Sequence, residues 1–372
     1  MKPRAPVPLG LGDRLSARIE ELDSEGLRRS LHAPCGIDLS SNDYLGLSRH
    51  PLVKRRMCEA VMIEGAGSTG SRLLRGHRES FARVERTFAA FKGAERSLYF
   101  SSGYLANLAV LSTFPEAGDV IFSDERNHAS LIDGMRLSRA RRVIFPHNDV
   151  DVLERMLRAE EGAGLRFVVV ESLFSMDGDA APLAAYAALC REYDAALIVD
   201  EAHAVGIYGA RGSGLMEDAG IASDVFVSVN PAGKALGVGG AFVAGSDAAI
   251  EFMIQRARPF IFSTAPPPAM AAALEAALEV IATEPDRRER LLSRARYLRG
   301  LLGLPGDSQI IPVIIGDNAR TVAVASVLQA AGFDVRAIRP PTVPAGTARL
   351  RIAVNEGLAE ATLEKLAAAL AI

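Results

Sequence analysis

The chain has 372 residues, a length that accommodates a large hydrophobic core and favours two domains over one. Its composition is 49% hydrophobic and 23% charged with a formal net charge of −3, so it gives no electrostatic case for a nucleic-acid or anionic-membrane partner. The three cysteines, Cys35, Cys58 and Cys190, show neither metal-type spacing nor a disulfide framework, which indicates a reducing compartment. Residues 1–6 lack the apolar core of a signal peptide, and we expect a cytoplasmic protein.

The first 93 residues predict a helix, a short strand at residues 37–39, a turn leading into a helix near Pro51, an irregular segment and a final helix. The first helix falls within residues 13–30, and its apolar face carries Leu15, Ile19 and Leu22. Residues 65–76 are rich in glycine, serine and arginine and are expected to be irregular. The final helix is predicted over residues 79–92 and ends at Gly93.

Apolar runs that alternate with helical stretches occupy the middle of the chain. We predict strands buried on both faces at residues 97–100, 120–122, 142–145, 167–170, 195–199, 225–229 and 241–244. Helices are predicted between most of them, at residues 105–114, 149–160 and 183–193. This alternation predicts an α/β fold with a mostly parallel seven-stranded sheet covered by helices. The last two runs are too close together for a crossover helix, which leaves room for one antiparallel strand.

The pattern changes after the three prolines at positions 266–268. Two long helices are predicted at residues 270–283 and 286–302, followed by strands at 310–315, 334–338 and 348–353 and by helices at 320–331 and 358–370. This arrangement predicts a smaller α+β domain. We therefore divide the chain into an N-terminal helical segment (1–45), a large α/β domain (46–268) and a small C-terminal α+β domain (269–372).

An acid, a histidine and a lysine suggest the chemistry of the large domain. Asp200 directly follows a predicted buried strand, His203 comes three residues later, and Lys234 lies in a glycine-rich stretch. A carboxylate keeps a pyridine nitrogen protonated, and a lysine amine bonds covalently to an aldehyde, so the set suits pyridoxal phosphate. Each residue alone has a plainer explanation: a helix cap, a structural histidine and a solvated lysine.

Other strand ends carry polar groups that belong at the same edge of a parallel sheet. The backbone at Gly103 and Tyr104 opens a helix and suits a phosphate, although a simple serine N-cap explains the same sequence. His128 can stack on a flat ring or serve structure, and Ser175 can reach a cofactor oxygen. On the predicted strand at 348–353, Arg351 or Arg349 can clamp a carboxylate in bidentate fashion, against the default of a surface arginine.

These motifs, in this order, resemble the pyridoxal-phosphate-dependent α-oxoamine synthases of the fold-type I aminotransferase superfamily. The resemblance runs from about Leu39 to the C-terminus and is carried by SSNDYLGL (40–47), GSTGSRLLRGH (67–77), SSGYLANLAVL (101–111), NHASLIDG (127–134), ESLFSMDGDAAPL (171–183), VDEAHAVGIYGARGSG (199–214), GKALGVGGAFVAG (233–245), FSTAPPP (262–268) and IRPPTVPAGTARLRI (338–352). It implies the fold of a fold-type I transferase.

The resemblance also implies roles for individual residues around a bound pyridoxal 5′-phosphate. Lys234 matches the lysine that bonds to the cofactor, and Asp200 matches the partner of its pyridine nitrogen. His203 and Ser175 match groups around the 3′-oxygen, and His128 matches the stacking ring. The remaining cofactor positions are the backbone at Gly103 and Tyr104 and, reaching the neighbouring subunit of a homodimer with shared active sites, Ser263 and Thr264.

For the substrates, the resemblance implies a decarboxylative condensation of L-alanine with a pimeloyl thioester, giving 8-amino-7-oxononanoate in biotin biosynthesis. Arg351 matches the carboxylate-binding arginine, with Asn42 nearby, and Arg28 (or Arg29) matches an arginine near the acyl substrate. The acyl carrier, coenzyme A or an acyl carrier protein, stays open. No metal ligand is implied.

Departures from the family pattern and rival functions remain open at this point. Pro231 stands where the family usually has a phosphate-contacting threonine, with Ser228 or Asn230 as substitutes, and Phe81 stands where it often has a histidine. The rivals are a glycine-using synthase of the 2-amino-3-oxobutyrate ligase or 5-aminolevulinate synthase type, a cofactor-binding protein without turnover, and a metal hydrolase. The last is the weakest, because the six histidines offer no ligand-spaced pair.

Overall fold

The computed structural model describes residues 10–160 and 164–370 of the chain. The stretch of residues 1–6 that we interpreted as unlike a signal peptide lies outside the described residues. Within the described ranges, no helix is both long and apolar enough to cross a membrane.

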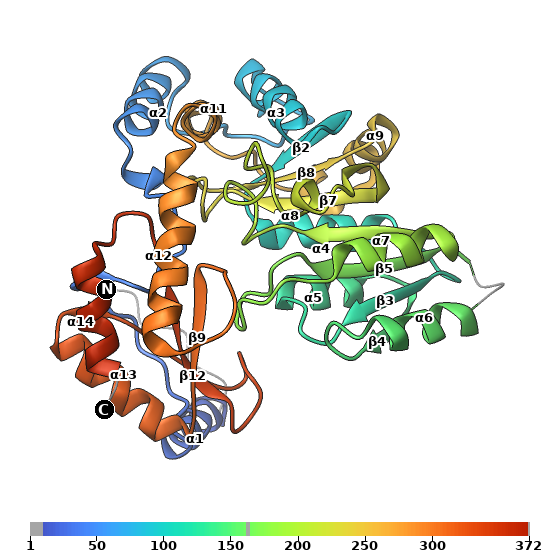
Figure 1. Cartoon of the computed structure of the whole chain (residues 1–372). Helices are drawn as coiled ribbons and strands as arrows, with labels where there is room; N and C mark the ends of the chain where they lie inside the picture. The colour runs from blue at the N-terminus through green and yellow to red at the C-terminus, as the bar shows by residue number, and fades with distance from the viewer. Residues whose placement is uncertain (1–9, 161–163, 371–372) are drawn as a thin grey trace.

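A seven-stranded sheet forms the centre of the molecule (Figure 1). Its strands lie in the order β2-β8-β7-β6-β5-β3-β4. The bounds are β2 (Arg96–Phe100), β3 (Val120–Asp124), β4 (Arg141–Phe145), β5 (Arg166–Glu171), β6 (Ala195–Asp200), β7 (Val225–Pro231) and β8 (Ala241–Gly245). All pairings are parallel except those of β8, which is antiparallel to both neighbours. The seven predicted strands and the antiparallel one are confirmed.

Helices cover both faces of this sheet because alternate strand residues point to opposite sides. Val169 and Ile198 pack in the cluster that includes α4 (Gly103–Thr113), α5 (Ala129–Leu137), α9 (Asp247–Arg256) and α10 (Arg258–Ile261). Val168 and Val199 pack on the other side, in the cluster that includes α6 (Val150–Ala159), α7 (Leu183–Glu192) and α8 (Leu215–Asp218). Both clusters are needed to bury the central strands, as the continuous apolar runs predicted.

One predicted strand is not buried on both faces. β4 is the edge strand next to β3, and Arg141, Arg142 and Ile144 are exposed. The prediction of burial was wrong here because β4 pairs on one side only, and its two arginines and exposed isoleucine face outward. Lysine- or arginine-bearing edge strands are a usual defence against edge-to-edge pairing.

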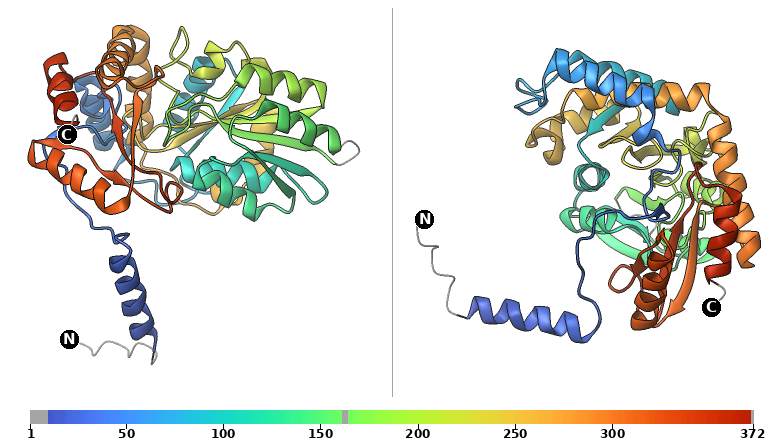
Figure 2. Two further views of the ribbon diagram at one scale, coloured as in Figure 1. Left: turned by 60° about the horizontal axis from the view of Figure 1, so that its bottom comes forward. Right: turned by 90° about the vertical axis from the view of Figure 1, so that its left-hand side faces the viewer.

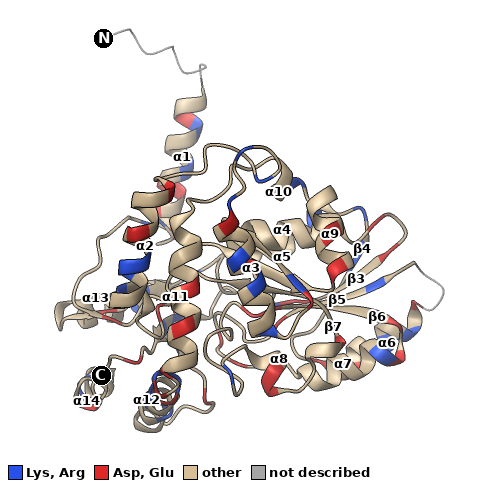
Figure 3. Cartoon of the chain, turned by 90° about the horizontal axis from the view of Figure 1, so that it is seen from above, with Lys and Arg blue, Asp and Glu red and all other residues tan. Residues whose placement is uncertain are grey.

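The N-terminal helices differ in how much they bury. α2 (Pro51–Glu64) and α3 (Glu79–Lys92) lie against α11 (Ala269–Thr283), and two ion pairs join them, Arg83–Glu275 at 2.8 Å and Arg56–Glu279 at 3.8 Å (Figure 3). By contrast α1 (Leu11–Ser24) projects from the body of the molecule (Figure 2), and its apolar residues Leu11, Leu15, Ile19 and Leu22 are exposed. The predicted apolar face therefore exists, and it covers nothing among residues 10–160 and 164–370.

The C-terminal part forms a smaller layer of sheet and helices. A three-stranded antiparallel sheet has the order β11-β12-β9, with β9 (Ile310–Gly316), β11 (Ala337–Ile338) and β12 (Ala348–Ala353). The long helix α12 (Asp286–Leu302), α13 (Asn318–Ala330) and α14 (Glu360–Leu370) accompany it. Short 3-10 turns at Leu47–Arg49 and Ala222–Asp224 complete the described elements.

The strand predicted at residues 334–338 is two strands in two sheets. β10 (Phe333–Asp334) pairs in parallel with β1 (Ile37–Asp38), and β11 then pairs with β12. Asp334 explains the break, because its carboxylate accepts from the Cys35 amide (3.2 Å) and from Arg336 Nε (2.7 Å). The N-terminal segment is therefore joined to the C-terminal part, which a reading of local pattern did not predict.

Candidate active site

The buried acid at the end of β6 is held by two hydrogen bonds. Asp200 is 3% exposed, and its carboxylate accepts from the Ala202 amide (2.8 Å) and from Asn107 Nδ2 (2.7 Å). The same Asn107 amide donates to Ser130 Oγ (2.9 Å). Asn107 lies on α4, so a helix and a strand end together fix the orientation of the acid. Our sequence analysis missed Asn107; the only signal was one amide within an otherwise apolar helix.

His128 is connected to this acid through Ser130. Its Nδ1 accepts from the Ser130 amide (3.2 Å) and lies 2.8 Å from Ser130 Oγ, which places the proton of the neutral ring on Nε2. The pKa of His128 is lowered by burial and by the charge of Lys234, against the opposing charge of Asp200. The predicted position of His128 beside Asp200 and Lys234 is thus observed, while stacking on a ring stays a prediction.

Lys234 follows β7 and approaches two carboxyl groups. Burial lowers the pKa of Lys234, as does the charge of Arg351, while Asp200 and Glu171 raise it. Glu171 is 2% exposed and sits beside Asp200 in the β5–β6 register. Burial and the charge of Asp200 raise the pKa of Glu171 to about 8. The neutral form of Glu171 is therefore favoured at neutral pH, in a site that also holds Asp200, Lys234 and the buried Arg351.

The glycines around Lys234 fall into two kinds, those required by close packing and those next to open space. Gly237 has a φ of +66°, and a Cβ there would collide with the backbone of Leu47 and Ser48. Gly240 in the same way touches the ring of Tyr99. A Cβ on Gly233 or Gly239 would meet only open space or a distant methionine carbon. Gly237 and Gly240 are therefore required by packing within the chain, whereas Gly233 and Gly239 are not.

His203 belongs to a network that joins the two parts of the molecule. Its Nδ1 lies 2.8 Å from the hydroxyl of Tyr44, which is fully buried and also contacts Asn42 Oδ1 (2.9 Å). Arg351 Nη2 donates to the same hydroxyl (3.2 Å). The pKa of His203 is well below 6.5 because the ring is buried and faces the charges of Lys234, Arg351 and His128. Tyr44 was not predicted, although it lies in the quoted motif at 40–47.

The two arginines of β12 bind the loop that carries Ser175. Arg351 Nε donates to the Ser175 carbonyl (2.6 Å), and Arg349 Nη1 donates to Asp177 Oδ1 (2.5 Å). Both arginines are buried, at 7% and 4% exposure. Neither is therefore a surface arginine, and Arg351 is the one that also reaches Tyr44 and Lys234.

The predicted phosphate seat lies at the start of α4. Ser102 caps this helix by accepting from the Leu105 amide (3.2 Å), and Gly103 and Tyr104 form its first turn. Tyr104 is 42% exposed, and its side-chain hydroxyl donates to Asp133. The backbone amides of Gly103 and Tyr104 are a separate set of donors for a ligand. Pro231 lies directly beside Gly103, since a Cβ on that glycine would be 2.6 Å from Pro231 Cγ. Pro231 thus packs against the helix start and offers no hydroxyl there.

Two pairs of predicted residues, Ser263 with Thr264 and Arg28 with Arg29, lie away from this cluster within the chain. Thr264 bridges Ser71 in antiparallel fashion next to Ser263, and the neighbouring Ala265 amide donates to the Gly70 carbonyl (2.9 Å). Arg28 pairs with Asp23 (2.5 Å), and Arg29 donates to the Pro340 carbonyl (3.2 Å). Their predicted contacts with phosphate and acyl substrate stay predictions.

The residues present fit pyridoxal phosphate. The fit rests on buried polar atoms that have no partner among the described residues, Glu171 Oε1 and Asn107 Oδ1, and on Lys234, for which no hydrogen bond is found in that same part of the chain. A carboxylate, a covalent-bond-forming amine, a neutral histidine and free helix-start amides are the donor set this cofactor requires. Asp200, His203, Lys234 and the amides of Gly103 and Tyr104 would hold it.

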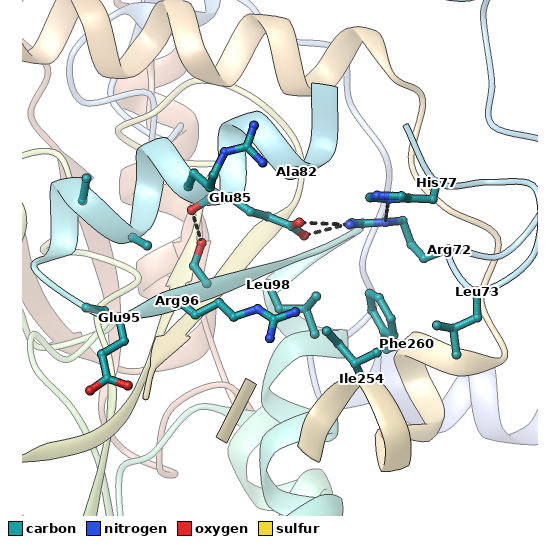
Figure 4. Close-up of a pocket in the computed structure, with 15 residues that line it drawn as sticks. Arg72, Leu73, His77, Ala82, Glu85, Glu95, Arg96, Leu98, Ile254 and Phe260 are labelled. Carbon is teal, nitrogen blue, oxygen red and sulfur yellow. Dashed lines mark hydrogen bonds and ion pairs between the residues drawn. The ribbon is translucent and has the colours of Figure 1, made fainter. Parts of the chain in front are cut away.

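A separate cavity of about 740 Å³ contains none of these residues (Figure 4). It lies along α3 and the start of β2, and Arg72 there forms a two-point ion pair with Glu85 (2.9 and 3.0 Å). Phe81 lies beneath Arg72, 4.7 Å from guanidinium carbon to ring centroid, and 6.0 Å from the Tyr99 ring. Phe81 is therefore a core residue beside an internally satisfied arginine.

Comparisons with known proteins place the chain among a defined group. The family model for aminotransferase class I and II matches residues 35–370. An 8-amino-7-oxononanoate synthase of Anaeromyxobacter dehalogenans (strain 2CP-1 / ATCC BAA-258) is 47% identical, covering 97% of this chain and 96% of its own length. The corresponding protein of Paraburkholderia xenovorans (strain LB400) is 44% identical, covering 96% and 97%.

Solved structures agree with this grouping. A serine palmitoyltransferase of Sphingomonas wittichii superposes with a TM-score of 0.91 at 31% identity, covering 98% of this chain and 97% of that one. An 8-amino-7-oxononanoate synthase of Francisella tularensis superposes with a TM-score of 0.78 at 29% identity, covering 90% and 96%. The shared fold extends over nearly the whole chain.

Proposed function

The chain belongs to the aminotransferase class I and II family and, within it, groups with the 8-amino-7-oxononanoate synthases; from this we propose that it condenses L-alanine with a pimeloyl thioester. It is a fold-type I enzyme whose cofactor is pyridoxal phosphate. The reaction joins the α-carbon of alanine to the acyl carbon, and it releases the thiol and CO2. The product is 8-amino-7-oxononanoate.

The observation that carries the proposal is the group formed by Lys234, Asp200 and Glu171. It places a lysine of lowered pKa beside a charged and a neutral carboxyl group in a buried site. When bound, pyridoxal phosphate supplies an aldehyde for the substrate amine and an electron-withdrawing ring for the carbanion. The rest of the work falls to side chains of this chain.

Lys234 serves as the base that takes the α-proton of alanine. A lowered pKa increases the neutral fraction of its amine near neutral pH, and a neutral amine is the form that accepts a proton. Asp200 supplies the negative charge opposite the pyridine nitrogen, and Asn107 holds that carboxylate in place. A neutral His203, whose Nδ1 contacts the Tyr44 hydroxyl, would bind the 3′-oxygen of pyridoxal phosphate.

Arg351 binds the carboxylate of alanine. Its guanidinium is anchored at Nε by the Ser175 carbonyl and at Nη2 by Tyr44, which leaves further N–H groups for a bidentate contact. Asn42 lies on the far side of Tyr44, within the same network. His128 and Ser175 complete the predicted surroundings, and Arg28 is assigned to the acyl substrate.

The proposal includes a homodimer with shared active sites. Exposed apolar side chains surround the Ser71–Thr264 bridge: Leu73 (50% exposed), Leu74 (82%) and Phe262 (71%). A patch of this kind next to two predicted phosphate ligands suits a second copy of the chain, which would bring Ser263 and Thr264 to the neighbouring site.

Several finer points belong to the proposal as well. The three free cysteines suit a cytoplasmic location, and the division at residues 45 and 268 serves as the domain description. The glycine-using synthases remain the rival, since one methyl group is worth only about 1–3 kcal/mol of discrimination. Coenzyme A and an acyl carrier protein remain the alternatives for the acyl carrier.

The decisive experiment measures CO2 release from labelled amino acids. Purified enzyme loaded with pyridoxal phosphate is given L-alanine or glycine together with pimeloyl, acetyl or succinyl thioesters of coenzyme A, and pimeloyl thioester of an acyl carrier protein. We expect the highest kcat/KM for alanine with a pimeloyl thioester. A preference for glycine with acetyl or succinyl thioester would overturn the proposal in favour of the rival.

A further inference from the structure

A histidine outside the proposed site lies between two carboxylates. His147 follows β4, and its side chain is 10% exposed. Its Nδ1 lies 3.0 Å from Asp124 Oδ1, and its Nε2 lies 2.6 Å from Asp179 Oδ2. The ring also packs edge-on against Phe174 at a centroid distance of 4.4 Å. Asp124 ends β3 and Asp179 belongs to the segment after β5, so the histidine bridges two parts of the large sheet's edge.

Both ring nitrogens face carboxylate oxygens, which accept hydrogen bonds but cannot donate them. A neutral imidazole carries one N–H, whereas the imidazolium ion carries two, so the double contact requires the charged form. Burial lowers the pKa of His147, but the hydrogen bonds and charges of Asp124 and Asp179 outweigh it and raise the pKa to about 9. Among the described residues no cluster suited to a metal ion is found, so these contacts are charge-assisted hydrogen bonds.

The segment held by His147 is the Ser175 loop, defined as residues 172–180. It closes on itself through the Phe174 amide to the Asp179 carbonyl (3.0 Å) and the Gly178 amide to the Phe174 carbonyl (2.9 Å). Its base also receives Asn148 Nδ2, which donates to Asp179 Oδ2 (3.0 Å). The base of the loop is thereby fixed to the ends of β3 and β4.

The tip of the same loop contacts the C-terminal sheet. Arg351 and Arg349 donate to Ser175 and Asp177, as described above, and Ser308 Oγ donates to the Gly178 carbonyl (2.5 Å). Gly178 has a φ of +69° and lies so close to the Ile310 carbonyl that a Cβ would not fit. The position of this tip therefore decides where the Arg351 guanidinium stands.

We propose that His147 is a positioning residue for the site: its imidazolium clamps the base of the Ser175 loop so that Ser175 and Arg351 are held for cofactor and amino acid. It touches neither of them. The chain of contacts runs from Asp124 through His147 and Asp179 to the loop tip, and from there to Arg351. The assignment of Ser175 and Arg351 to the cofactor and the amino acid rests on the proposed function, whereas the clamp itself does not.

Other charged groups lie around His147, Asp124 and Asp179 and contribute to the pH dependence of this cluster. Asp124 also accepts from the amides of Arg126 and Asn148, and Glu125 accepts from the His147 amide (3.2 Å). Arg126 pairs with Asp177 (3.2 Å), and the charges of Asp124 and Asp149 act on Tyr186. Of these, His147 is the group that gains or loses both a charge and a donor when pH passes about 9.

The test is hydrogen–deuterium exchange of the Ser175 loop in the enzyme loaded with cofactor. The variant His147→Gln removes the imidazolium that makes both contacts of the clamp, and Asp179→Asn removes the charge of one of its two partners. As a control, His50→Gln removes a comparable contact elsewhere, His50 Nε2 to Glu284 (3.2 Å). We expect the amides of Phe174 and Gly178 to exchange about tenfold faster in the first two variants and at the wild-type rate in the third. In the wild type alone, exchange relative to the intrinsic rate should accelerate as pH rises through about 9.

Unchanged exchange in both clamp variants, or an acceleration spread evenly over the chain, would overturn the proposal. Asp179→Asn changes a side chain that is 41% exposed, so this variant can still be measured if His147→Gln does not fold. A parallel titration with L-alanine, followed by the cofactor absorbance, should show weaker binding in both variants. If L-alanine does not change the cofactor absorbance of the wild type, the result contradicts the proposed function. The hydrogen–deuterium exchange result would still test the proposed role of His147.

Discussion

Asp200 ends β6 and Glu201 follows it; each acid lies near a lysine, and the hydrogen bonding around the two lysines differs. Glu201 is fully buried and pairs with Lys92, which also donates to the Ser213 carbonyl (2.5 Å). The other Glu201 oxygen accepts from the Met216 amide (3.0 Å). Asp200, one residue earlier, faces Lys234 in a site where Glu171 Oε1 and Asn107 Oδ1 have no partner among the described residues.

The difference separates a structural ion pair, Lys92 with Glu201, from the proposed cofactor site around Lys234. Around Lys92 every donor and acceptor named above is used, so removing one partner leaves an uncompensated buried charge. In the Lys234 site Glu171 Oε1 and Asn107 Oδ1 have no partner among the described residues, which is costly for stability and is explained if a ligand completes them. A lysine near an acid is common to both places; the completeness of the surrounding hydrogen bonding tells them apart.

The largest effect is expected on activity from Lys234→Ala. Because Lys234 is the proposed covalent partner of the cofactor and the proposed base, its loss should lower kcat by about four orders of magnitude or more. The unfolding free energy should stay unchanged or rise, because no hydrogen bond is lost. Steady-state CO2 release and urea denaturation measure the two. Lys54→Ala, at an exposed position on α2, is the control, and substantial turnover by Lys234→Ala would refute the assignment.

Lys92→Met should give the opposite result, with stability lost and chemistry retained. We expect a loss of about 3–5 kcal/mol in unfolding free energy, since Glu201 is left charged and buried. Replacing both partners, Lys92→Met with Glu201→Leu, should recover much of that loss. Denaturation curves with the cofactor absorbance as a second probe decide the matter. Equal stability of the single variant and the wild type would show that the pair is not structural.

The strand ends explain how much of this could be predicted from the sequence. Because carboxyl ends of parallel strands share one edge, Asp200, His128, Ser175 and Lys234 could be assigned to one site from residue patterns alone. Tyr44 and Arg351 meet across 307 positions of sequence, a contact that no local pattern contains. Asn107 and Glu171 were missed as site residues for another reason: a lone polar residue in an apolar run has a plain structural explanation until its neighbours are known.

Removing the negative charge of Asp200 and of Glu201 in turn distinguishes the roles of the two acids. Asp200→Asn should lower kcat by about 10²–10³-fold with little change in stability, because the neutral amide no longer stabilises a charged pyridine nitrogen. Glu201→Gln should instead lower stability and leave kcat near the wild-type value. Rates measured below the unfolding temperature of both variants make the comparison. Similar rate losses in the two variants would mean that the acids are not functionally distinct.

The smallest effect concerns Glu171, the acid beside Asp200 in the Lys234 site, and it depends on pH. Burial, and next the charge of Asp200, raise the pKa of Glu171 from 4.5 to about 8. Between these values the folded protein keeps a proton that the unfolded chain has lost, so the unfolding free energy of the wild type should fall as pH rises from about 4.5 to about 8. Glu171→Gln removes this titration, so its advantage over the wild type should grow across that range. Urea denaturation after removal of pyridoxal phosphate measures it, and parallel pH curves for the two proteins would contradict the protonated state assigned to Glu171.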